Sequence, residues 1–254
     1  MSGRQLLLFI FFLASANAPT LAEELTVAVA SNFTAAMKEI AAEFEKASGH
    51  RVKLAFGSSG KFYAQIKNGA PFQVFFSADT AKPTALERDG LAVPGSRFTY
   101  AEGSLALWSA DPALVDDRTS VLKRGQFRKL ALANPKLAPY GQAAVEVLRN
   151  LDLEETTRAK WVQGENIAQT YQFVATGNAD LGFVALSQVV RGGRVKEGSA
   201  WIVPGDLYSA IRQDAVLLQR GAESDGAAEF LQFVRGEKAR AIIESYGYRF
   251  PEPQ

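Results

Sequence analysis

Residues 56–62, "FGSSGKF", place two serines between glycines, with a lysine after the second glycine. Serine hydroxyls and the main-chain N–H groups of a small-residue turn donate hydrogen bonds, so such a turn can hold an anion. The P-loop of nucleotide-binding proteins is excluded, because it requires glycine where this chain has Ala55 and Ser or Thr where it has Phe62. The residues also suit an ordinary helix cap. The turn therefore predicts either an anion site that is not a nucleotide site, or a cap without a ligand.

Three further segments have the same character, since each follows a strand-like run and precedes a helix-like run. The four segments are 30–32, 57–60, 138–141 and 164–167. In open α/β sheets, ligands bind at the carboxyl ends of strands. Helix N-termini there offer free N–H groups and a partial positive charge. Four such ends, two from each half of the chain, predict one anion-binding cleft, although four simple caps fit the same pattern.

The donors in these segments are hydroxyls, one amide side chain and main-chain N–H groups, and Glu165 is the acid near their centres. A tetrahedral dianion without a proton offers only acceptors and suits such a pocket. Phosphate near neutral pH often keeps a proton, which needs an acidic acceptor. The pattern therefore favours a fully deprotonated oxyanion.

Strands and helices alternate along the chain. The segments 25–31, 52–57 and 74–79 are strand-like, and the third is apolar throughout, as in a strand buried on both faces. Apolar residues from Phe33 to Phe44 recur at helical spacing, and 225–244 reads as one amphipathic helix. This order predicts an α/β fold with parallel or mixed sheets and helices on both faces.

The 232 residues that remain of the 254 after removal of a signal at 1–22 suggest two lobes rather than one core. The extended runs 98–109 and 208–219 are the predicted crossings between the lobes. We expect a signal peptide at 1–22 and the second lobe at 104–206. The first lobe is then made of 23–103 plus 207–254.

The N-terminal segment has the features of a secretory signal: Arg4, then an apolar run over 6–14, then small residues. A cut after Ala22 is favoured over one after Ala18, which Pro19 follows. The chain has no cysteine. A lipid anchor, a disulfide scaffold and a thiolate metal site are therefore not expected, and the exported protein is expected to be free in the periplasm.

Removal of residues 1–22 takes away one of 28 basic residues, Arg4, and none of the 27 acidic residues, which leaves a net charge near zero. Nucleic acid is therefore not expected as a partner. His50 is the one histidine of the chain and lies in "ASGHRV", where we expect a solvated turn residue. A secreted serine hydrolase would have to use His50, and the chain lacks a Gly-x-Ser-x-Gly elbow.

The chain resembles the periplasmic molybdate-binding proteins of ABC importers, which have the two-lobe, type II substrate-binding fold. The resemblance covers nearly all of the chain after residue 22. It rests on "VAVASNFTAAMKEIAAEFEKASGHRV", "FGSSGKFYAQIKNGAPFQVFFSAD", "LALANPKLAPYGQAAVEVL", "GENIAQTYQFVATGNADLGFVALS" and "YGYRF".

This resemblance implies an oxyanion held between the lobes by hydrogen bonds. Ser31 and Ser59 look like the hydroxyl donors of the first lobe, and Asn32 follows as in one subgroup. Tyr140 and Ile167 look like the positions that give main-chain N–H groups from the second lobe. No metal is ligated directly, since molybdenum is held as the oxyanion, and no cofactor or catalytic residue is implied.

Two departures concern the ligand. Many relatives have a tyrosine where this chain has Ala185, and Tyr140 stands where alanine is common. The Tyr140 hydroxyl is therefore a candidate for the missing donor, beside the alternative that only its N–H contacts the anion.

The expected function is capture of molybdate, and also tungstate, by a monomer that delivers it to a membrane permease. Another oxyanion such as sulfate is the first alternative. A sensor or structural role and a secreted hydrolase are alternatives of other classes.

Overall fold

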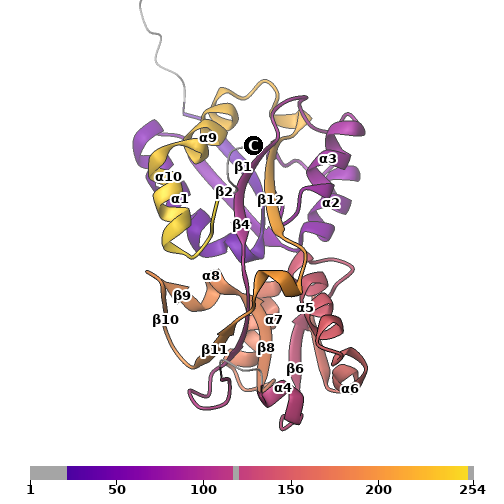
Figure 1. The fold of residues 1–254 in the computed structure, drawn as a ribbon. Helices are drawn as coiled ribbons and strands as arrows, with labels where there is room; N and C mark the ends of the chain where they lie inside the picture. Colours follow the sequence, from indigo (N-terminus) through magenta and orange to yellow (C-terminus); the bar gives the residue numbers. More distant parts are fainter. Residues whose placement is uncertain (1–21, 117–119, 251–254) are drawn as a thin grey trace, which may run out of the picture.

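The computed structural model of the protein describes residues 22–116 and 120–250. Figure 1 shows two lobes, one above the other, each built around its own five-stranded sheet. The predicted signal peptide at 1–22 lies, apart from Ala22, outside the described residues.

Lobe I, the upper lobe in Figure 1, contains both ends of the described chain. Its elements are β1 (Glu24–Ala30), the 3₁₀ helix η1 (Ser31–Phe33), α1 (Thr34–Ser48), β2 (Arg51–Gly57), α2 (Ser59–Lys67), β3 (Val74–Phe76), α3 (Ala81–Arg88), β4 (Phe98–Gly103), β12 (Ile211–Leu217), η3 (Gln219–Gly221), α9 (Asp225–Arg235) and α10 (Glu237–Ser245).

Lobe II is formed by the middle of the chain. Its elements are β5 (Leu105–Ser109), α4 (Ser120–Arg124), β6 (Leu130–Ala133), α5 (Pro139–Asn150), α6 (Glu154–Arg158), β7 (Trp161–Gly164), α7 (Ile167–Ala175), β8 (Leu181–Ala185), α8 (Leu186–Val189), β9 (Val190–Arg191), β10 (Arg194–Val195), β11 (Ser199–Ile202) and η2 (Gly205–Leu207).

Both sheets are mixed. In lobe I the strand order is β2-β1-β3-β12-β4, with β1 parallel to β2 and β3, and β12 antiparallel to both neighbours. In lobe II the order is β11-β5-β8-β6-β7, with β6 parallel to β7 and β8, and β5 antiparallel to β8 and β11. The parallel strands carry the helices that begin at the cleft, which confirms the predicted α/β class.

Alternation along the central strands explains why both faces of the lobe I sheet are covered. Leu25, Val27 and Val29 of β1 join a core with α1, α9 and α10, whereas Ala28 joins a second core with α2 and α3. Successive side chains of a strand point to opposite faces, so an apolar run buries both. The prediction of a strand buried on both faces at 74–79 is confirmed for Val74–Phe76, whose residues are all fully buried.

The chain passes between the lobes twice, at β4 to β5 and at β11 to β12 (Figure 1). The first crossing is short, because β4 ends at Gly103 and β5 begins at Leu105. The second runs from Val203 to Ala210, and Tyr208 within it packs into the lobe II core. The two crossing strands pair with each other, with Ile211 opposite Gly103.

One sequence prediction about a single element was wrong. The segment 225–244 is two helices rather than one, because Gly236 is extended, at φ −76° and ψ 163°, and separates α9 from α10. Propensity and apolar spacing continue across this break, and packing decides it. The run 98–109, predicted as a crossing, contains two strands that lie in different sheets, with Ser104 between them.

Replacement of Phe33 tests the packing that supports the first loop at the cleft. Its ring is fully buried and lies 4.8 Å from the Tyr100 ring and 5.2 Å from the Tyr248 ring, between centroids. Phe33→Ala should lower the free energy of unfolding by about 3–5 kcal/mol, the usual cost of such a cavity. Phe33→Leu is the control and should cost clearly less in the same urea titration. Equal losses for the two variants would contradict this packing role.

Candidate functional site

The four segments singled out in the sequence come together at the interface between the lobes. They follow β1 and β2 in lobe I, and β6 and β7 in lobe II. All five predicted site residues, Ser31, Asn32, Ser59, Tyr140 and Ile167, line one small cavity, with a free volume of about 10 Å³. The rest of its lining is Ala30, Gly57, Ser58, Ala78, Ala138, Pro139 and Asn166. Each of the five predicted residues is at most 6% exposed, so their polar groups are largely shielded from water.

Main-chain N–H groups are the first set of donors at this cavity. Ser59, Tyr140 and Ile167 stand in the first turn of α2, α5 and α7, where N–H groups have no acceptor within their own helix. Neighbouring N–H groups have partners elsewhere. That of Gly60 donates to Leu137 O at 2.9 Å, and those of Ala168 and Gln169 donate to Asn166 Oδ1 at 3.0 Å.

Hydroxyl groups form the second set. Ser59 Oγ accepts a hydrogen bond from the Ala78 N–H at 2.9 Å, which orients the hydroxyl and leaves its hydrogen to donate. Ser31 Oγ donates to Asn166 Oδ1 at 3.3 Å, a long contact to an oxygen that already accepts two N–H groups. An anion in the cavity would offer Ser31 a stronger acceptor, because bonds to ionised acceptors are shorter and stronger.

The amide side chain of Asn32 is directed away from the cavity. Its Nδ2 donates to Gln213 Oε1 at 2.7 Å and to Tyr248 OH at 3.0 Å. Both amide hydrogens are thereby used inside lobe I. The expectation of an amide side chain as an anion donor is therefore wrong for Asn32, and its main-chain N–H is the group left for a ligand.

The Tyr140 hydroxyl also lies away from the cavity, beside the crossing strands. It accepts a hydrogen bond from Gln213 Nε2 at 3.3 Å. A Cβ atom placed on Gly103 would come within 2.0 Å of this hydroxyl, so glycine is required there. Burial raises the pKa of Tyr140 well above its usual value, and the hydroxyl is neutral. Of the two options for Tyr140, the geometry therefore favours its N–H as the donor to a ligand.

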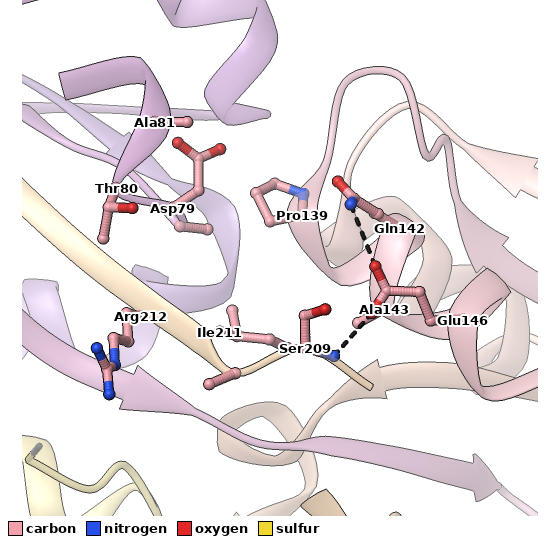
Figure 2. Close-up of a pocket in the computed structure, with 12 residues that line it drawn as sticks. Asp79, Thr80, Ala81, Pro139, Gln142, Ala143, Glu146, Ser209, Ile211 and Arg212 are labelled. Carbon is pink, nitrogen blue, oxygen red and sulfur yellow. Dashed lines mark hydrogen bonds between the residues drawn. The ribbon is translucent and has the colours of Figure 1, made fainter. Parts of the chain in front are cut away.

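Charged side chains lie around the cavity rather than in it, since all twelve lining residues are uncharged. Lys61 Nζ and Glu165 Oε1 form an ion pair across the lobes at 2.7 Å, with both side chains about half exposed. Figure 2 shows a larger neighbouring cavity, which shares Ala78 and Pro139 and carries the charges of Asp79, Glu146 and Arg212. Its free volume is about 200 Å³. The smaller cavity is the better site for an anion, because it contains no carboxylate.

Comparison with known proteins identifies the family of this two-lobe chain. The bacterial extracellular solute-binding protein family matches residues 25–249. The chain belongs to this family.

Several relatives of this solute-binding protein are similar over almost their whole length. The molybdate-binding protein ModA of Azotobacter vinelandii is 57% identical over 227 residues, 89% of this chain and 90% of that protein. ModA of Rhodobacter capsulatus is 54% identical over 231 residues, 91% and 90% of the two chains. The solved structure of the Azotobacter vinelandii periplasmic molybdate-binding protein matches with a TM-score of 0.87 and 44% identity, over 90% of this chain and 100% of that one. The predicted resemblance and the two-lobe type II fold are confirmed.

Membership of a solute-binding family confirms that this protein is not an enzyme, and the surroundings of His50 agree. His50 is 2% exposed, so the prediction of a solvated residue was wrong. Its Nδ1 accepts from the Glu23 N–H at 3.0 Å, and its ring stacks on Phe44. It lies next to the start of β2, whereas Ser59 follows the end of that strand, so the two cannot form a catalytic pair.

The described residues hold no cluster of three or more His, Asp or Glu side chains suited to a metal ion. In residues 22–116 and 120–250, no helix has the length and hydropathy needed to cross a membrane.

Sequence reasoning missed two groups of residues at the site. Ser58 and Asn166 line the cavity as N-caps of α2 and α7, and the preference of Ser and Asn for that position could have indicated them. Gln213 and Tyr248, which hold Asn32, carry no comparable local signal, since only folding brings them within reach.

Titration at alkaline pH tests whether burial raises the pKa values of three tyrosines. Burial is the main reason that the pKa values of Tyr100, Tyr140 and Tyr248 are raised. The unfolded chain loses these protons near pH 10, whereas the folded protein keeps them. Their contribution to stability is therefore fully present below about pH 10 and is lost as the pH rises above it. When urea midpoints are measured from pH 8 to 11, they should decrease above about pH 10. Tyr140→Phe should make this decrease with pH less steep. A tyrosinate absorbance curve for the folded protein in which all seven tyrosines titrate together near pH 10 would contradict this assignment.

Proposed function

We propose that this protein captures molybdate, and also tungstate, between its lobes and delivers it to the permease of an ABC importer. The observation that carries the proposal is the cavity between the lobes, which is lined by buried, uncharged residues and in which the available groups are donors. The relatives named as molybdate-binding proteins support the same ligand.

The chemistry of the cavity selects the class of anion. A fully deprotonated tetrahedral anion needs donors on every side, and the cavity offers N–H groups from both lobes and the hydroxyls of Ser31 and Ser59. A ligand that keeps a proton needs an acceptor, and Asn166 Oδ1 already accepts two N–H groups. Phosphate is therefore disfavoured.

The proposed ligand groups are the hydroxyls of Ser31 and Ser59 and the N–H groups of Ser31, Asn32, Ser59, Tyr140 and Ile167. Helix N-termini add a partial positive charge that favours an anion. The apolar side chain of Ile167 is compatible with this role, because only its main chain would contact the ligand. No cofactor is proposed.

Sulfate is the competing ligand, because it is also a tetrahedral dianion without a proton at neutral pH. The sulfate-binding protein SubI of Mycobacterium tuberculosis shares the fold, with a TM-score of 0.71 at 11% identity. That likeness concerns the fold alone, and the relatives of higher identity favour molybdate.

The cellular setting is part of the proposal. We infer a signal peptide at 1–22, and a monomer without a lipid anchor in the periplasm. The proposed lobes are 23–103 with 207–254, and 104–206. The separate sheets support this division, with strands β1 to β4 and β12 in one and β5 to β8 and β11 in the other.

Thermal unfolding with a panel of anions tests the ligand. The mature protein is heated with molybdate, tungstate, sulfate or phosphate in turn, at equal ionic strength. A ligand at about 100 times its Kd adds about 2.7 kcal/mol of stability, which raises the Tm by roughly 5–10 °C for a chain of this size. Molybdate and tungstate should raise the Tm, and phosphate should not. A rise in Tm with sulfate alone would indicate that sulfate, and not molybdate, is the ligand.

Ser59→Ala tests the site itself. Loss of this hydroxyl should weaken molybdate binding by about 1–3 kcal/mol, the cost of removing a partner from a buried charged acceptor. Ser245→Ala is the matched control, since its hydroxyl donates to Ile242 O at the end of α10, and it should bind as the wild type does. Equal calorimetric affinities for the two variants would argue against the Ser59 assignment.

A further inference from the structure

Gln213 connects the two lobes behind the anion cavity. It lies on β12, directly after the second crossing, and is fully buried. Its Oε1 accepts from Asn32 Nδ2 at 2.7 Å and from Tyr100 OH at 3.0 Å, both in lobe I. Its Nε2 donates to Tyr140 OH at 3.3 Å, in lobe II. One neutral amide thus contacts a cavity-lining residue of each lobe.

The position of Gln213 is set by the crossing strands. Gln213 pairs with Ala101 of β4, and the register shifts directly after it, between Gln213 and Asp214. Such a bulge redirects a side chain out of the regular alternation. Gly103 leaves room on the opposite strand, since a Cβ there would lie 2.5 Å from Gln213 Nε2 and 2.0 Å from Tyr140 OH. The amide and the phenol therefore meet where the chain passes from one lobe to the other.

Two polar groups of Tyr140, its main-chain N–H and its hydroxyl, lie in different parts of the structure. Its main-chain N–H belongs to the first turn of α5, at the cavity. Its hydroxyl is held by Gln213 at the crossing. A shift of lobe II relative to lobe I would move both groups, because they belong to one residue at the start of α5. The bond to Gln213 therefore restrains where the N–H stands relative to Ser31 and Ser59.

We propose that Gln213 is a positioning residue for anion binding, which favours the closed cleft by holding α5 of lobe II to the Asn32 loop of lobe I. Gln213 lies behind Asn32 and Tyr140 rather than among the described residues that line the cavity, so it acts through them. This inference rests on the proposed function, and it assigns to a residue of the crossing strand a part in retaining the anion.

Two tyrosine-to-phenylalanine variants separate this role from general support of the fold. Tyr140→Phe removes the bond to Gln213, one of those that span the lobes, and leaves the main-chain N–H in place. Tyr100→Phe removes a hydroxyl from the same amide, but within lobe I, where the one hydroxyl hydrogen of Tyr100 is shared between Gln213 Oε1 and Ser77 O, the latter at 3.1 Å. Both side chains are 1% exposed, so the variants are matched in burial and chemistry.

Molybdate is the probe, with Kd from calorimetry and the release rate from stopped-flow tryptophan fluorescence. Tyr140→Phe should raise the Kd about three- to tenfold, mainly through faster release, as expected for loss of one neutral hydrogen bond. Tyr100→Phe should lower the Tm of the anion-free protein and change the Kd less than about twofold. In a Gln213→Leu background, Tyr140→Phe should have little further effect, because the two residues are coupled. Equal Kd changes in the two phenylalanine variants, or additive effects with Gln213→Leu, would overturn the proposal.

A measurement without ligand separates this proposal from the proposed function. The radius of gyration from X-ray scattering of the anion-free protein should be larger for Tyr140→Phe than for Tyr100→Phe, since only the former loses a link between the lobes. If wild-type protein binds none of the four anions, the proposed function fails, and this comparison still decides the role of Gln213. Equal radii in that case would overturn it.

Discussion

An anion removed from water must be surrounded by donors, and this structure supplies them without placing a full positive charge in the cavity. Moving an ion into a protein interior is costly unless hydrogen bonds replace its hydration. The cavity is lined by uncharged residues, and its donors are serine hydroxyls and N–H groups at helix starts. One helix start offers only a few N–H groups. A cavity of this kind therefore needs several helix starts from opposite sides, and this explains the architecture of two lobes with parallel strands that end at the cleft.

The contact between the lobes is polar for the same reason. Each lobe buries most of its apolar residues against its own sheet, and Ala30 and Ala78 of lobe I also pack against the core of lobe II. Hydrogen bonds such as Gly60 N–H to Leu137 O, and Ser187 Oγ to Asn32 O at 3.0 Å, join the lobes across the cleft. Polar contacts of this kind can form and break with small changes in free energy, which suits hinge closure around a ligand. The two crossing strands keep the lobes aligned during such a motion.

Local sequence predicted much of the fold and the place of the site. Apolar runs and helical spacing indicated strands and helices, and serines, asparagines and glycines marked the loops between them. The orientation of side chains at the site could not be obtained in this way. Asn32 reads as a ligand-binding amide, yet its amide serves Gln213 and Tyr248, which lie 181 and 216 residues further along the chain. His50 reads as a turn residue, yet it is buried because Glu23 and Phe44 enclose it.

The sequence by itself determined the α/β class, the positions of four donor-rich turns, and the absence of thiol chemistry, because these depend on residue type and spacing along one segment. The tertiary structure alone decided which groups of those turns face the cavity. It also decided that Tyr140 turns its hydroxyl to the crossing strands and that Gly103 makes room for it. The physical reason is that a donor bonds whichever acceptor is nearest in space, and in this protein the acceptor is brought near by strands and helices distant in the chain.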